Sequence, residues 1–204
     1  MQGVSNDTET ASTRSRLITA ANEAMRARGY RGTSVKDVLA VAEAPAGSLY
    51  HHFPGGKPEL AAAAVRDSGA VYGELYEAIA DAAPDVATGF ADFFAGAAEV
   101  LAAGDYLDVC PIGTIAGEVA SSDDDLRAAT DDVFRAWTAA GARRLRDAGL
   151  TDEDATAVAT TAIAALQGGF ILARARRDAD LLRTVGGQVA ALVTAALATV
   201  GTSR

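Results

Sequence analysis

The chain is short of cysteine and histidine: its 204 residues include one cysteine, Cys110, and two histidines, His51 and His52. A single thiol cannot form an internal disulfide, and no cysteine or histidine pair has the spacing of a zinc site. Neighbouring histidines on a helix point about 100° apart, so these two cannot share a metal ion. These absences exclude a disulfide-stabilised secreted fold, and we expect a cytoplasmic protein without a metal or cofactor.

Strand patterns and long hydrophobic runs are also lacking. The first residues are polar and have no signal-peptide core, and no apolar stretch of the sequence is expected to reach the about 20 residues of a membrane span. Valine, isoleucine and aromatic residues never alternate as strands require, whereas alanine is the commonest residue and prolines number five. The composition predicts a soluble, all-α protein with no membrane partner.

Positive charge is scarce and unevenly placed. The net charge is −9, yet residues 12–60 carry seven Lys and Arg against four Asp and Glu. Residues 61–204 carry 11 cationic against 21 acidic residues. Because phosphate binding needs clustered cations, only the basic head can be expected to meet a nucleic acid.

Apolar residues at helical spacing predict about nine helices. A first helix should run from Ser12 or Thr13 to Gly29, and a long one should begin at Pro58. N-cap spacing is found at Ser34 with Asp37, Ser122 with Asp125, and Thr151 with Asp154. The expected organisation is a disordered tail over 1–11, a compact basic head of three helices over 12–56, a longer helical body over 57–200, and a tail over 201–204.

The head has the dimensions of a helix-turn-helix. Two short helices, expected at 35–42 and 46–52, are separated by about three residues and follow a longer helix. Small residues at the start of the second helix would let its backbone approach base edges, and polar residues follow one turn later. The alternative is an ordinary three-helix packing unit whose polar residues face water. The candidate DNA-binding residues of this helix and its end are Ala46, Gly47, Ser48, Tyr50, His51, His52 and Lys57.

Two motifs of the head resemble the TetR family of transcriptional regulators. They are Thr33-Ser34-Val35-Lys36-Asp37-Val38 and Gly47-Ser48-Leu49-Tyr50-His51-His52-Phe53-Pro54-Gly55-Gly56-Lys57-Pro58-Glu59-Leu60. The run from His51 to Lys57, Cys110-Pro111-Ile112 and residues 168–175 are similar to the branch that includes lincomycin-resistance repressors. The resemblance implies that residues 12–56 form a helix-turn-helix DNA-binding domain and residues 57–200 a helical ligand-binding and dimerisation domain, in a homodimer paired through the last two helices of each subunit. It also implies a repressor that a ligand releases from a palindromic operator in double-stranded DNA.

The resemblance assigns roles within the head. Thr33 and Tyr50 would contact phosphates, Gly47 and Ser48 would face base edges, His51 or His52 would touch the DNA backbone, and Lys57 would clamp a phosphate. Two residues depart from the family pattern. Glu43 stands where the family usually has a turn glycine, and a positive φ there would cost about 1 kcal/mol. Ala46 replaces a Lys or polar residue, which removes one contact.

The acidic body offers a candidate effector site. Seven residues on apolar faces of the expected body helices combine aromatic rings with few polar groups, as a small apolar effector requires. Each of them could instead be ordinary core. They are Phe90, Phe94, Tyr106, Cys110, Trp137, Gln167 and Phe170.

The sequence therefore predicts a ligand-responsive transcriptional regulator. The alternative is a small-molecule-binding helical protein whose head no longer binds DNA specifically, which Glu43, Ala46 and the overall charge would favour. An enzyme is not expected, because the dense carboxylates, Asp123-Asp124-Asp125 and Asp131-Asp132, lack a catalytic pattern. Those at the start of a helix are explained by its dipole.

Overall fold

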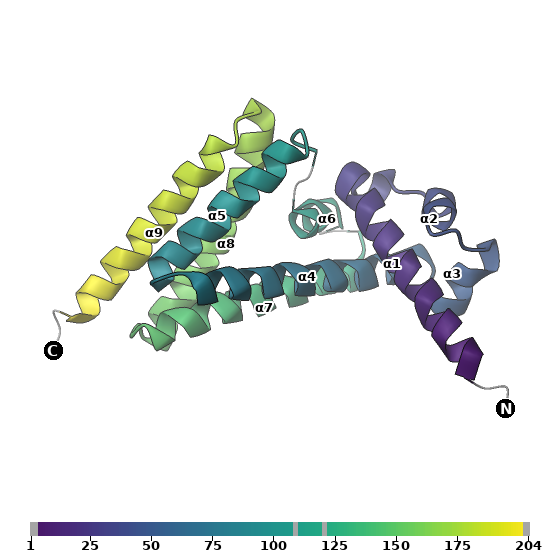
Figure 1. The fold of residues 1–204 in the computed structure, drawn as a ribbon, viewed down its shortest axis with the longest axis horizontal. Coiled ribbons are helices and arrows are strands. Elements are labelled where there is room, and N and C mark those ends of the chain that lie inside the picture. The colour runs from purple at the N-terminus through teal and green to yellow at the C-terminus, as the bar shows by residue number, and fades with distance from the viewer. Residues whose placement is uncertain (1–3, 108–109, 120–121, 202–204) are drawn as a thin grey trace. The chain divides into compact units, whose positions relative to one another are not determined.

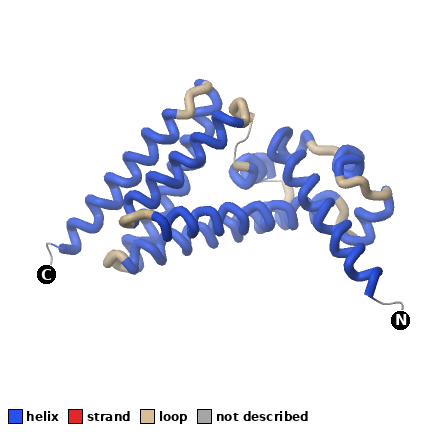
Figure 2. Tube along the Cα trace, in the orientation of Figure 1, coloured by secondary structure: helices blue, strands red, loops and turns tan. Residues whose placement is uncertain are grey.

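The computed structural model describes residues 4–107, 110–119 and 122–201, and these form nine α-helices and no strand (Figures 1 and 2). The all-α prediction is confirmed. The helices are α1 Val4–Gly32, α2 Val35–Val41, α3 Ala46–His52, α4 Lys57–Ala82, α5 Val86–Ala103, α6 Pro111–Val119, α7 Asp124–Asp147, α8 Asp152–Arg176 and α9 Asp180–Gly201.

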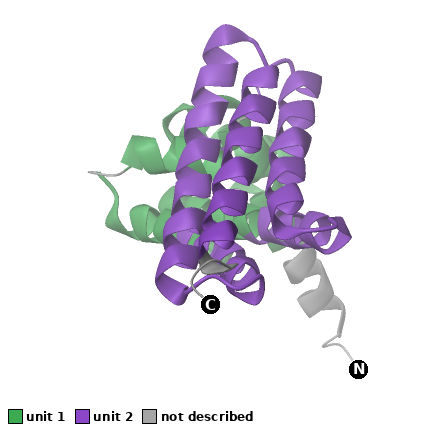
Figure 3. Ribbon diagram, turned by 90° about the vertical axis from the view of Figure 1, so that its left-hand side faces the viewer, with its two compact units in different colours: residues 1–69, 111–133 green, residues 70–110, 134–204 purple. Residues whose placement is uncertain are grey.

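The helices fall into two compact units (Figure 3). Unit 1 comprises residues 1–69 and 111–133, and unit 2 comprises residues 70–110 and 134–204. This division differs from the expected boundary between 56 and 57. The buried side chains of Leu60, Ala61 and Val65 belong to the same unit as the head, and α6 packs on α1. Both α4 and α7 pass from one unit into the other without interruption.

The ends of the chain also differ from the expectation. Helix α1 begins at Val4, which lies within the tail expected over residues 1–11, and residues 1–3 lie outside the described part. No proline or glycine interrupts residues 4–28, which explains why the helix continues. Gly29 leaves helical geometry with φ 71° and ψ 177°, as its predicted stop role requires. Gly201 ends α9, and residues 202–204 are not described.

In unit 1, α1, α2 and α3 share a core of Leu17, Met25, Val38, Leu49 and Phe53, all 3% exposed or less. Local caps fix the helix boundaries. Ser34 Oγ accepts a hydrogen bond from the Asp37 backbone N–H at 3.1 Å, as its spacing predicted.

Unit 2 is built around α5, α8 and α9, which pack on one another. Phe94, Leu101 and Leu182 are fully buried between them. At Gly186 a side chain would not fit, because a Cβ atom there would lie 2.5 Å from Cβ of Phe94. The close approach of α9 to α5 therefore depends on this glycine.

Three helices reach the length and apolarity of a membrane span: Val86–Ala103, Asp152–Arg176 and Asp180–Thr199, with mean hydropathy of 1.4, 1.6 and 1.5. The expectation that no apolar stretch would be long enough is wrong by length and composition. Alanine, which is frequent in all three helices, raises their hydropathy although its side chain is small. The three helices are α5, α8 and the larger part of α9, which together form the core of unit 2.

Candidate functional site

Helix α3 is anchored on one side and open on the other. Leu49 and Phe53 are buried against the rest of the head. Gly47 faces open space, since no atom lies within 4 Å of where its Cβ would be. Tyr50 is 64% exposed, and His51 is exposed as well. Small and polar groups thus cover the solvent face of this helix, as entry into a major groove requires.

The turn before α3 contains a left-handed residue. Glu43 has φ 50°, a region that residues other than glycine enter at a cost of about 1 kcal/mol. The turn therefore has the positive φ for which the glycine usual in the family would be favoured over Glu43. The carbonyl of Ala42 accepts a hydrogen bond from Arg16 Nε at 3.0 Å, which fixes this turn to α1. The exposed Glu43 carboxylate lies beside the helix expected to meet DNA.

Lys57, the first residue of α4, is half-buried. Its Nζ lies 4.4 Å from the centroid of the Tyr30 ring, a cation–π contact. Burial lowers the pKa of the Lys57 ammonium, and the Glu118 carboxylate partly opposes that shift. The charge is held at the start of a helix, beside Gly55 and Gly56, where a phosphate could approach.

Glu118 connects α6 to the end of α1 within unit 1. Its Oε2 accepts a hydrogen bond from the Arg31 backbone N–H at 2.8 Å, and its carbonyl accepts one from the Arg31 guanidinium at 3.2 Å. A Cβ at Gly29 would lie 1.9 Å from the same carboxylate. A glycine with positive φ and a carboxylate from α6 therefore fix the kink in the last turn of α1.

Two histidines end α3. Their ring centroids are 4.9 Å apart and nearly perpendicular, at 73°. Burial, the neighbouring His51 and the cation of Arg14 all lower the pKa of the His52 imidazole. His52 is therefore a neutral hydrogen-bonding group at pH 7. Among the described residues no group of three or more potential metal ligands occurs.

Thr33 is placed differently from its expected role. The side chain is 4% exposed, and its hydroxyl donates a hydrogen bond to the Gly29 carbonyl at 2.8 Å. The hydroxyl proton thus has an internal acceptor in this structure, and a phosphate contact from Thr33 stays a prediction. Lys36, by contrast, is an exposed cation in the first turn of α2 and was missed as a candidate. Its position inside the Thr33–Val38 motif could have identified Lys36 as a DNA-binding candidate from the sequence.

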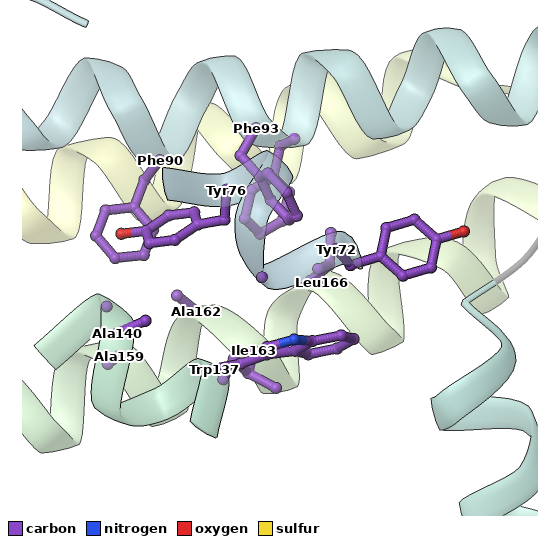
Figure 4. A pocket seen from close by; sticks show the side chains of 13 residues that line it. Tyr72, Tyr76, Phe90, Phe93, Trp137, Ala140, Ala159, Ala162, Ile163 and Leu166 are labelled. Atoms are coloured by element: carbon purple, nitrogen blue, oxygen red, sulfur yellow. The ribbon is translucent and has the colours of Figure 1, made fainter. Parts of the chain in front are cut away.

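The second site is a pair of adjoining hollows in unit 2, of about 50 Å³ and about 250 Å³. They share Tyr72, Phe93, Trp137 and Leu166. Figure 4 shows Tyr76, Phe90 and Phe93 grouped on one side of the smaller hollow and Trp137 on the other. The smaller hollow is also lined by Gly73, Phe94, Ala140, Gly141, Ala159, Ala162 and Ile163, and the larger by Leu75, Ile79, Gly96, Ala97, Glu99, Val100, Cys110 and Phe170.

Five of the seven predicted effector residues line these hollows: Phe90, Phe94, Cys110, Trp137 and Phe170. Gln167 is not among the lining residues, but its Nε2 donates a hydrogen bond to Sγ of Cys110, which is, at 3.5 Å. Tyr106 does not line either hollow. Its ring lies under the Arg177 guanidinium at 5.3 Å, so the structure gives it a packing role.

Tyr72, Tyr76 and Phe93 were missed. The ring centroids of Tyr76 and Phe93 are 5.5 Å apart, and those of Tyr72 and Trp137 are 6.3 Å apart. Burial, assisted by the Glu77 carboxylate, raises the pKa of the Tyr76 phenol to about 12. The hydroxyl therefore stays protonated and offers a hydrogen-bond donor beside an apolar space. Its spacing from Tyr72, four residues along α4, was the available signal.

Comparison with known proteins matches both parts of the chain to transcriptional regulators. Residues 17–64 match the family described as bacterial regulatory proteins, tetR family, and residues 86–188 match the LmrA/YxaF-like C-terminal domain of transcriptional regulators. The HTH-type transcriptional regulator YxaF of Bacillus subtilis (strain 168) is 29% identical over 186 residues, covering 91% of this chain and 97% of YxaF. LmrA of the same organism is 27% identical over 169 residues, covering 83% and 90%.

A solved structure agrees with these matches. The crystal structure of regulatory protein TetR from Rhodobacter sphaeroides superposes with a TM-score of 0.76 at 25% identity, covering 86% of this chain and 96% of that one. The resemblance seen in the head motifs is confirmed, and the body matches as well. The chain belongs to the TetR family of helix-turn-helix DNA-binding transcriptional regulators, with an LmrA/YxaF-like C-terminal domain.

Proposed function

We propose that this regulator is a cytoplasmic homodimeric repressor that binds a palindromic operator and is released from it by a small effector in unit 2. The observation that carries the proposal is the presence of two separate sites: an exposed recognition helix in unit 1 and an aromatic cavity in unit 2. Helices α4 and α7 run through both units, so a change at one site has a covalent, helical route to the other.

An exposed apolar face of α8 and α9 supports the dimer. Ile171 and Leu172 on α8 are 70% and 48% exposed, and Leu192 on α9 is 40% exposed. The broad apolar stripe of α9 is only partly used, since Leu182, Val189 and Val193 are buried while other apolar positions face outward. Large exposed aliphatic side chains beside small residues suit helix pairing with a second copy.

Two-fold symmetry then determines the operator. The two α3 helices of a dimer must enter successive major grooves about 34 to 36 Å apart, which requires a palindrome. An effector lowers operator affinity to the extent that it binds more tightly to a dimer whose α3 helices have a different spacing. Repression, rather than activation, is the family default that the resemblance implies.

The test is fluorescence anisotropy of the full chain on DNA from upstream of its own gene, against a scrambled duplex, at two salt concentrations. We expect a preference for the native duplex of about 10³ or more, with affinity that falls steeply as salt rises. Equal and weak binding to both duplexes, and to duplexes selected from a random pool, would contradict specific repression. That result would favour a small-molecule-binding protein whose departures at Glu43 and Ala46 have weakened its head.

A further inference from the structure

The described side chains that line the effector cavity carry negative charge but no positive charge. Residues 70–110, which supply α5 and the later part of α4, contain eight acidic residues and no lysine or arginine. Among the described residues that line the two hollows, Glu99 is the single charged side chain. Arg143 and Arg144 of α7 act on the lining residue Tyr76, but both are paired with Glu77 and neither lines a hollow. An anionic ligand would therefore find no counter-charge among the lining side chains, and it would meet a carboxylate.

The acidic residues of this part of the chain differ in whether a basic side chain pairs with them. Glu77 and Asp81 on α4 both pair with Arg144, and Asp105 pairs with Arg177. Within the described part of the chain, no hydrogen bond or ion pair involves the Glu99 carboxylate, which is exposed at the edge of the larger hollow. Its charge is left for a ligand or for solvent.

Aromatic rings line the same hollow. Tyr72, Phe93, Trp137 and Phe170 present π faces or edges to it, and Leu75 and Val100 add aliphatic surface at its exposed rim. Aromatic faces attract organic cations, most strongly where the cation is shielded from water. A carboxylate at the rim and aromatic rings within the hollow are complementary to a cationic group attached to an apolar body.

We propose that the cavity binds an organic cation, a tertiary or quaternary amine with an aromatic or aliphatic body, with Glu99 as its counter-charge. This inference deepens the proposed function, because it names the chemical class of the effector, and it rests on unit 2 being the effector site. The amine lies between Glu99 and the Tyr72 and Trp137 rings, and the apolar body fills the space toward Phe93 and Phe170.

The intrinsic tryptophan fluorescence of the chain can measure binding in this cavity, because Trp137 is its only tryptophan and lines the larger hollow. Full-length protein is titrated with three probes of similar size while Trp137 fluorescence is followed: benzyltrimethylammonium, its uncharged analogue neopentylbenzene, and phenylmethanesulfonate. We expect the cation to bind about tenfold more tightly than neopentylbenzene, and the sulfonate to bind more weakly than either.

Two variants make the test specific. Glu99→Gln should remove most of the preference for the cation and leave neopentylbenzene binding unchanged. Asp92→Asn removes the same charge from an exposed position on α5 that does not line the cavity, and it should keep the preference. Neopentylbenzene or the sulfonate binding as tightly as the cation would overturn the proposal. A preference that survives Glu99→Gln, or a fluorescence signal that none of the three probes changes, would overturn it too.

The same titration, repeated with labelled operator DNA present, separates this proposal from the proposed function. If the cation binds in a Glu99-dependent way but leaves DNA affinity unchanged, the ligand class stands and release by a ligand in this cavity fails. If neopentylbenzene binds better and releases the DNA, the effector role stands and the cationic class fails.

Discussion

The recognition helix and the cavity of unit 2 are built in opposite ways. Helix α3 is seven consecutive residues, and its exposed face consists of backbone, a phenol and an imidazole on a short, firmly anchored element. The cavity takes its wall from α4, α5, α7 and α8, and nearly all of that wall is apolar. One site depends on a few exposed side chains, whereas the other depends on the packing of four helices, so the two should respond differently to substitution.

The largest effect on DNA binding should come from a substitution in the proposed dimer interface, the exposed apolar face of α8 and α9. Ile171→Asp adds a charge at a position that is 70% exposed in the single chain, so the fold is spared while the proposed contact between two copies is lost. We expect the solution mass to fall from dimer to monomer and operator binding to fall by about 100-fold or more, since one head meets only one half-site. Sedimentation measures the mass, and anisotropy measures DNA binding.

Val71→Asp is the matched control, because Val71 is another exposed β-branched apolar residue, 58% exposed and on α4. It should leave the dimer intact. An Ile171→Asp variant that remains a dimer would show that this face is not the interface.

Substitutions in the head should come next in size. Tyr50→Ala combined with Lys57→Ala removes two proposed phosphate contacts per subunit, so operator affinity should fall by about 100-fold and the salt dependence should become shallower. Ligand-induced changes in Trp137 fluorescence should be unchanged, because neither residue belongs to unit 2. Unchanged operator affinity in anisotropy titrations would remove both residues from the DNA-binding face.

A smaller effect is expected at the turn before α3, where the effect of the strained backbone and the effect of the Glu43 charge can be measured separately. Glu43→Gly relieves the positive φ of 50° and should raise the free energy of unfolding by about 1 kcal/mol in urea titrations. Glu43→Gln keeps the strained backbone but removes the charge beside α3, so it should leave stability unchanged while raising DNA affinity a few-fold. Equal stability of the two variants would show that the turn is not strained.

The smallest effect concerns pH. The folded protein holds the His52 pKa below its ordinary value through burial and neighbouring charge. The unfolded chain therefore binds a proton at higher pH than the folded one does. The stabilisation from neutral His52 is present above about pH 6.5 and is lost as pH falls through the lower, folded pKa. His52→Asn should flatten the change in urea midpoint between pH 7.5 and 5.5, and an unaltered pH profile would contradict this role.

Much of the head could be predicted because its determinants are local. Ser34 with Asp37, and Thr151 with Asp154 in the body, form the caps that their spacing indicates. At Ser122 the prediction was wrong by one residue: the Asp123 carboxylate, not the Ser122 hydroxyl, accepts from the Leu126 backbone N–H at 2.9 Å. Three acids in a row offered several equivalent caps, and only tertiary packing of the buried Leu126 selects among them.

The cavity could be predicted only in part, because its determinants are not local in the sequence. Phe90, Trp137 and Phe170 stand out on apolar helix faces, but whether a ring lines a space or fills it depends on contacts between distant segments. Tyr106 lies under Arg177, a residue more than 70 positions away, and Thr33 is turned inward by a bond to Gly29. The first of these contacts has no signal within a few residues of the side chain, and the second depends on the backbone leaving helical geometry at Gly29, four residues earlier.

The way in which the two units divide the chain limits how its head or its body can be exchanged with that of another regulator. The chain crosses between them at residues 69 and 70, 110 and 111, and 133 and 134. Two of these crossings fall inside α4 and α7, and the third is a single peptide bond between Cys110 and Pro111. A chimera that joins this head to another regulator's body at residue 56 would split unit 1. A sensor exchange that keeps both cores whole must replace residues 70–110 and 134–204 together and preserve the register of two continuous helices.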